Sequence, residues 1–90
     1  MSRNSRIVQL VPPARDGEAE LGERVTVIDL TTSAVHDYRL VEPDGDHVAD
    51  GEASVRAPLG SALLGRHVGD VISVEVNGQL LRLEVVEIDG

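Results

Sequence analysis

The sequence predicts a small α+β domain, in which four or five mostly antiparallel strands are covered on one face by one short helix. Three observations support this fold class. Two apolar runs near the C-terminus flank an Asn77-Gly78 dipeptide, residues 24–30 alternate with a period of two, and a short stripe of helical spacing follows Pro58. A chain of 90 residues suffices for one domain with a modest core.

Five or six short segments account for the predicted elements. The strands before the helix cover residues 24–30, 35–41 and 53–56. Residues 7–11 form an apolar run that two prolines stop, and this pattern fits either an edge strand or the remnant of a longer upstream element. In residues 24–30, Val25 and Val27 share one face. The run Glu42-Pro43-Asp44-Gly45 has strong turn chemistry and ends the strand of residues 35–41.

The last two strands are predicted together with their register. Asn77 and Gly78 both tolerate positive φ, so they form a two-residue hairpin loop between residues 71–76 and 79–88. Apolar side chains then fall on one face of the hairpin, which we expect to be the core side. The facing pairs on that side are Val76–Gln79, Val74–Leu81 and Ile72–Leu83.

The expected helix lies between these groups of strands. Pro58 suits the first helical position because its φ is already fixed and its missing N–H has no partner there. Leu59, Ala62 and Leu63 then share one face of the helix. Gly65 can adopt the left-handed conformation that ends a helix.

Composition narrows the classes of function. Hydrophobic residues make up 41% of the chain, which is typical of a globular protein. The formal net charge is -8, so we expect no direct binding to nucleic acid, whose phosphates carry the same sign. The chain has no cysteine, one tyrosine and no apolar run of the ~20 residues that a membrane span needs. We therefore expect a cytoplasmic protein that does not enter a membrane.

No constellation of residues indicates an enzyme or a metal site. The candidates are the histidines His36, His47 and His67 and the acidic residues Asp44, Asp46, Asp50 and Glu52. The histidines lack the helical spacing of a metal pair, and the acidic residues lack the spacing of a calcium loop. No serine has nucleophile-elbow neighbours, and the chain contains no lysine. We expect no catalytic residue, no metal and no cofactor.

Residues 57–70, with the sequence APLGSALLGRHVGD, resemble the S-P-[LI]-G-R-A-L-[LI]-G-K-x-x-G-D signature of the C-terminal domain of Gre-type transcript-cleavage factors. The same domain occurs in the related regulator of nucleoside diphosphate kinase. The resemblance extends from Gly22 to Asp89 and includes the segments 21–27, 38–44 and 51–55. It implies an FKBP-like domain over residues 22–90, with a twisted antiparallel sheet wrapped on a short helix, preceded by an N-terminal segment of residues 1–21.

The resemblance also implies a partner. In the family this domain docks on the largest subunit of RNA polymerase, at the rim of the secondary channel, through the segment around the Ser-Pro dipeptide. The corresponding residues here, and the expected partner-binding residues, are Arg56, Ala57, Pro58, Leu59 and Gly60. We therefore expect a non-enzymatic module that modulates transcription elongation as a monomer or weak homodimer. The alternative is an FKBP-like interaction domain that binds a different protein or itself.

Several positions depart from the family pattern. Ala57 replaces the family's serine, which removes a helix N-cap hydroxyl worth about 1 kcal/mol. Arg56 stands where the family often has Asn or Asp, and Ser61 replaces its Arg. Residues 1–21 contain two prolines and lack the family's coiled coil, whose acidic tip helps to hold a catalytic magnesium ion, so we expect no stimulation of transcript cleavage. Tyr38 alone cannot provide the aromatic pocket of an FKBP-type prolyl isomerase.

Overall fold

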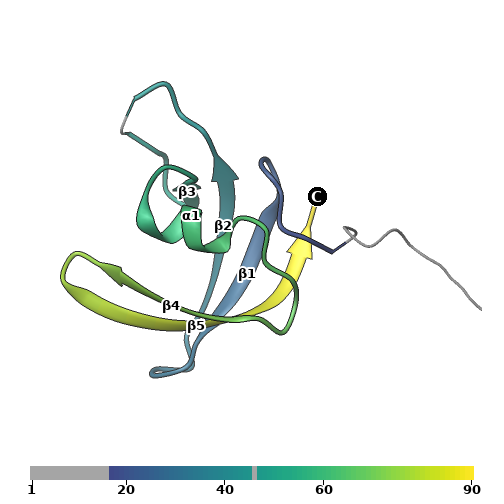
Figure 1. Cartoon of the computed structure of the whole chain (residues 1–90), viewed down its shortest axis with the longest axis vertical. Helices are drawn as coiled ribbons and strands as arrows, with labels where there is room; N and C mark the ends of the chain where they lie inside the picture. Colours follow the sequence, from purple (N-terminus) through teal and green to yellow (C-terminus); the bar gives the residue numbers. More distant parts are fainter. Residues whose placement is uncertain (1–16, 46) are drawn as a thin grey trace, which may run out of the picture.

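The computed structural model describes residues 17–45 and 47–90, and the apolar run of residues 7–11 lies outside this part of the chain. The described residues form a curled five-stranded sheet with one short helix on its inner side (Figure 1). The elements are β1 (Arg24–Asp29), β2 (Val35–Val41), β3 (Glu52–Ser54), α1 (Pro58–Leu63), β4 (Val71–Val76) and β5 (Gln79–Asp89). The predicted α+β fold class is confirmed.

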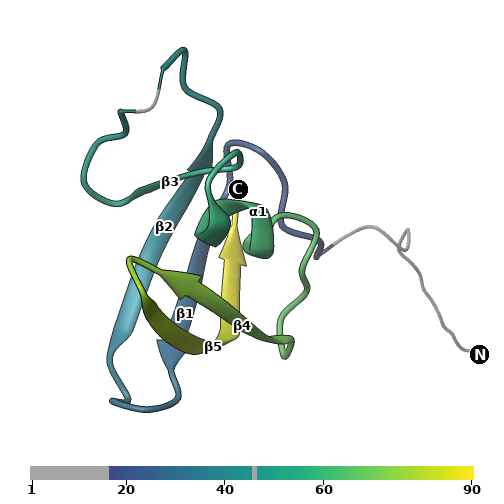
Figure 2. The ribbon, with the colours of Figure 1, turned by 60° about the vertical axis from the view of Figure 1, so that its left-hand side comes forward.

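The sheet is mixed, with the strand order β3-β2-β1-β5-β4. β1 pairs antiparallel with β2 and β5, and β4 pairs antiparallel with β5. β3 pairs parallel with β2, which the sequence did not predict. The reason is the long connection between β2 and β3, which carries the chain back alongside β2 instead of closing a tight hairpin (Figure 2). β3 also ends at Ser54 rather than Arg56, because the chain turns there and Ala57 donates its N–H to the Ser54 carbonyl.

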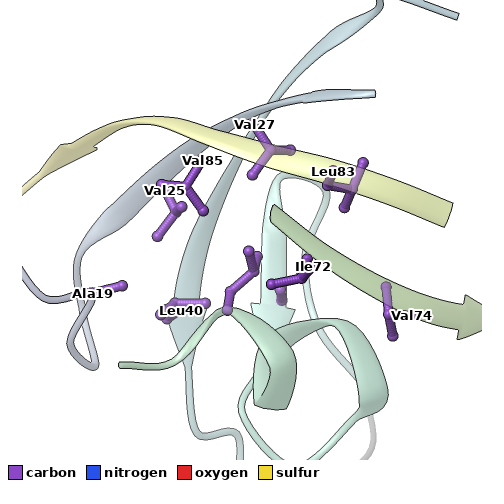
Figure 3. Close-up of a cluster of buried hydrophobic side chains, with 10 residues drawn as sticks. Ala19, Val25, Val27, Leu40, Ile72, Val74, Leu83 and Val85 are labelled. Carbon is purple, nitrogen blue, oxygen red and sulfur yellow. The ribbon is translucent and has the colours of Figure 1, made fainter. Parts of the chain in front are cut away.

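The core lies between the inner face of the sheet and α1 (Figure 3). Val25 and Val27 of β1 are fully buried, while Thr26 and Ile28 between and beyond them face the other side, so the predicted alternation is confirmed. The buried hydrophobic residues are Ala19, Val25, Val27, Leu40, Ala53, Leu63, Ile72, Val74, Leu83 and Val85. No polar or charged residue within the described ranges is buried, so aliphatic packing holds this core together.

The hairpin of β4 and β5 has the register expected from its loop. Asn77 and Gly78 have φ values of 54° and 79°, as a type I′ turn requires. Every predicted pair is observed, including Ile72 with Leu83 and Val74 with Leu81. The loop chemistry and the hydrophobic pattern therefore specify the same pairing.

β5 curls the sheet around the helix. It has 11 residues, pairs with β4 through its first part and then pairs with β1. Thr26 faces Glu87 and Val27 faces Val85, so Val86 is an extra residue and forms a bulge. Bulges bend a strand and increase its twist. This bend explains why one sheet can cover α1 from two directions (Figure 1).

α1 packs as its stripe predicts. Leu63 is fully buried, and Leu59 and Ala62 lie partly buried against the core. Gly65 has a φ of 83° and follows the helix, as expected. Gly60 is buried so close to β3 that an added Cβ would overlap the Ser54 carbonyl group. This close approach fixes the distance between the helix and the sheet edge.

The residues before β1 close one end of the core. Ala19 is 1% exposed, although it precedes Gly22, where the domain was expected to begin. Its N–H donates to the Arg66 carbonyl and its carbonyl accepts from the Gly65 N–H, each at 2.8 Å. These two bonds hold the segment against the chain that leaves α1.

A Gly60→Ala substitution should lower the free energy of unfolding by about 3 kcal/mol, because the new methyl group meets backbone atoms that cannot move without shifting β3. Urea unfolding followed by circular dichroism measures the change. Gly45→Ala is the matched control: nothing lies within 4 Å of its added Cβ, so a change within about 0.5 kcal/mol is expected. Equal effects at both glycines would contradict the packing role of Gly60.

Candidate functional site

The five predicted partner-binding residues, Arg56, Ala57, Pro58, Leu59 and Gly60, are contiguous and form one corner of the domain, which we call the docking edge. The docking edge joins β3 to α1. Arg56, Ala57 and Pro58 are exposed, Leu59 is half-buried and Gly60 is buried. The first three therefore present the accessible surface, while the last two secure the helix to the core.

Backbone hydrogen bonds hold the docking edge in place. Val55 donates its N–H to the Val41 carbonyl at 2.9 Å, which ties the segment to β2. Ala57 donates to the Ser54 carbonyl at 3.0 Å, and the Arg56 N–H donates to the Ser54 hydroxyl oxygen at 3.1 Å. The edge is thus positioned by the sheet as well as by the helix, which makes it a preorganised surface.

α1 begins without a side-chain cap. Ala57 occupies the N-cap with an extended backbone, φ -97° and ψ 162°, and its carbonyl accepts the N–H of Ser61 at 2.9 Å. Its methyl group cannot accept a hydrogen bond from the first turn. Pro58 follows at the first helical position, as predicted, and removes one of the unpaired donors.

A hollow of about 300 Å³ opens beside the docking edge. It is lined by Gly45, Ser54, Arg56 and Ala57. The Arg56 guanidinium donates a hydrogen bond to the carbonyl oxygen of Pro43, which joins the connection after β2 to the docking edge. Sequence reasoning assigned only Arg56 and Ala57 to a site. No periodic pattern links them to Pro43 and Gly45, because that contact comes from the long connection between β2 and β3.

The histidines and the acidic loop do not converge. His36, His47 and His67 are exposed. Within residues 17–45 and 47–90, no group of three or more His, Cys, Asp or Glu side chains could hold a metal ion; Asp46 lies outside these ranges. The Glu52 carboxylate accepts the Ala49 N–H at 2.9 Å, so it supports the turn before β3.

A second hollow, of about 400 Å³, lies on the outer face of the sheet. Its lining residues are Arg24, Thr26, Val35, Asp37, Glu87 and Asp89. Arg24 pairs with Asp89 at 3.2 Å, and the Thr26 hydroxyl donates to Asp37 at 2.6 Å. Four of its polar side chains thus pair with one another, and the carboxylate of Glu87 is exposed. The alternation of the strands could have placed these residues on one face, although nothing in the sequence marks the hollow.

The described part of the chain contains no helix that is both long and apolar enough to cross a membrane.

Comparison with known proteins identifies relatives over nearly the whole chain. Residues 14–90 match the family described as "Transcription elongation factor, GreA/GreB, C-term". The chain is 36% identical to the transcription elongation factor GreA of Thermotoga neapolitana over 81 residues, which is 89% of this chain and 52% of that protein. It is 39% identical to GreA of Syntrophobacter fumaroxidans over 82 residues, 89% of this chain and 53% of that protein. The chain thus spans about half the length of these curated relatives.

Solved structures give the same result. The crystal structure of GreA factor homolog 1 (Gfh1) from Thermus thermophilus superposes with a TM-score of 0.73 at 30% identity, over 94% of this chain and 56% of that one. The transcription elongation factor GreA/GreB from Nitrosomonas europaea superposes with a TM-score of 0.69 at 28% identity, over 89% of this chain and 64% of that one. The sheet and helix described above are therefore an arrangement that these factors share.

Restoring a cap hydroxyl at position 57 should stabilise the domain. Ala57→Thr and Ala57→Val have side chains of nearly the same shape, but only threonine offers an oxygen to the first turn of α1. We expect the threonine variant to be more stable than the valine variant by about 1 kcal/mol in urea unfolding. Equal stability of the two variants would show that the start of α1 does not need a cap.

Proposed function

The chain belongs to the C-terminal-domain family of the transcription elongation factors GreA and GreB, and from this membership we propose that it docks on bacterial RNA polymerase and modulates elongation. The docking edge is the surface proposed to make the contact. The observation that carries the proposal is that the family signature begins at a corner of the domain that is both exposed and held by hydrogen bonds to β2 and β3.

The proposed contact is with the largest subunit, at the rim of the secondary channel. Three features support binding there through protein surfaces rather than nucleic acid. Arg56, Ala57 and Pro58 are exposed, the net charge is -8, and the chain contains no lysine. The action we propose is binding without catalysis, in the cytoplasm where polymerase works. The competing hypothesis is that the same edge binds another protein or a second copy of the chain.

We propose further that this chain does not stimulate transcript cleavage. Pro12 and Pro13 lie within residues 1–21, and adjacent prolines disfavour a continuous helix through this stretch. A chain that docks without a coiled coil would occupy the polymerase site and leave the catalytic centre unchanged. Its expected effect on a full-length factor is therefore competition.

Binding is tested by titrating bacterial core RNA polymerase into a fluorescently labelled chain and recording polarisation. We expect a Kd of about 1–10 µM, because a small docking edge gives a transient complex. Ala57→Gln adds bulk to the exposed edge and should weaken binding about tenfold. Ser73→Gln, on the exposed outer side of β4, is the control and should change the Kd less than about twofold.

Two outcomes of that titration would contradict the proposal. One is no binding at tens of micromolar by a chain that circular dichroism shows to be folded. The other is binding that Ala57→Gln leaves unchanged, which would place the contact elsewhere on the domain. Sedimentation of the chain alone over a concentration series tests the self-association form of the competing hypothesis, which requires a stable dimer that Ala57→Gln disrupts.

Competition is tested on a backtracked elongation complex. The chain alone should leave the rate of transcript cleavage at its intrinsic level. Added to a complex with a full-length cleavage factor, it should lower the stimulated rate in proportion to the fraction of polymerase it occupies. A several-fold increase in cleavage by the chain alone would overturn the proposal that it lacks this activity.

A further inference from the structure

Among the residues that the structure describes, Arg56 supplies the one charged side chain that lines the hollow beside the docking edge. The other lining residues are Gly45 and Ala57, whose small side chains leave the space open, and Ser54, which adds a hydroxyl. The groups that face this space from side chains are therefore a guanidinium and a hydroxyl, and both can donate hydrogen bonds. A space lined in this way fits a guest that accepts hydrogen bonds and carries negative charge.

The Arg56 guanidinium is held by a hydrogen bond to the Pro43 carbonyl, but this bond does not neutralise its charge. It donates to the Pro43 carbonyl, which is an uncharged acceptor and uses only part of the guanidinium's five N–H groups. Within residues 17–45 and 47–90, Arg24–Asp89 is a side-chain ion pair, His67–Asp70 is one only when the imidazole is protonated, and neither includes Arg56. The Pro43 contact thus orders the side chain in advance, which lowers the entropy lost when a guest binds.

The surrounding charge makes this position selective. With a net charge of -8, the chain as a whole attracts basic partner surfaces. An exposed arginine in a hollow instead favours an acidic group on the partner. A guanidinium matches the two oxygens of a carboxylate in a paired geometry. A nucleic-acid backbone fits less well, because its many phosphates meet the acidic charge of the whole chain.

We propose that the hollow beside Arg56 receives an aspartate or glutamate side chain of the protein partner, and that Arg56 determines which partner surface the docking edge accepts. The proposal rests on the proposed function, since it describes how the same edge recognises polymerase. It assigns to Arg56 a direct contact and to Pro43 the positioning of its guanidinium. The partner surface that fits must carry a carboxylate next to a patch that accommodates Ala57 and Pro58.

The test compares charge variants in the polarisation titration with nucleic-acid-free core polymerase. Arg56→Gln should weaken binding about tenfold, and Arg56→Glu should weaken it further because it opposes the partner carboxylate. Arg56→Lys should retain part of the affinity, since it keeps the charge without the planar fork. Arg82→Gln, which removes the same charge from the exposed outer side of β5, should change the Kd less than about twofold.

Salt dependence gives an independent readout. Raising the salt concentration should weaken wild-type binding more than it weakens Arg56→Gln, because the variant has lost a charge pair that salt screens. The melting temperature of each variant, measured by circular dichroism, identifies any that fails to fold. A structural role alone would lower the melting temperature without changing the salt dependence.

The outcomes separate this inference from the proposed function. If the wild type binds and Arg56→Gln weakens binding no more than Arg82→Gln does, the carboxylate contact is overturned and polymerase docking is left intact. If Arg56→Gln loses affinity only for an elongation complex, and not for nucleic-acid-free polymerase, the carboxylate contact is also overturned. The group bound by Arg56 would then be a nucleic-acid phosphate. Failure of the folded wild type to bind at all would overturn both.

Discussion

The close approach of Gly60 to the Ser54 carbonyl is the constraint on which the domain depends. α1 has only 6 residues and little helix stability of its own, so contacts with the sheet must hold it. A side chain at position 60 would push the helix away from β3. With hydrogen there, Leu63 reaches the core and Ala57 and Pro58 sit beside the end of β3. The packing of the core and the geometry of the docking edge are thus consequences of one contact.

The sequence was sufficient where local chemistry decides the structure. Asn77-Gly78 admits one hairpin geometry, and the apolar residues on both sides agree with it, so the register of β4 and β5 was predicted residue by residue. Pro58 and Gly65 marked the helix for the same reason. The parallel pairing of β3 depends instead on the path of a long connection, which no local pattern specifies. The bulge at Val86 is equally hidden, because it is defined only by the partner strand.

The position of the candidate site stays a prediction from the sequence, and its shape could not be predicted from the sequence. Arg56 to Gly60 were identified through the signature that begins there, and the structure brings them to one corner. Gly45 lines the hollow and Pro43 holds the Arg56 side chain, and both come from the connection after β2. The sequence pattern predicted only a turn for these residues. Gly60 illustrates the same division: the sequence shows a glycine, but the backbone oxygen that requires it belongs to another strand. Contacts between distant segments therefore supply what the linear pattern omits.

The length of β5 has a consequence for synthesis of the chain. β5 lies in the interior of the sheet and is the last of the five described strands to be made, and its far end pairs with β1, with Arg24 opposite Asp89. During synthesis β1 therefore lacks one of its two neighbouring strands until β5 has emerged from the ribosome. Sheets built on such distant pairings close slowly. During that interval the inner faces of β1 and β2 are open to water, and the nascent chain is exposed to chaperones and proteases until β5 arrives.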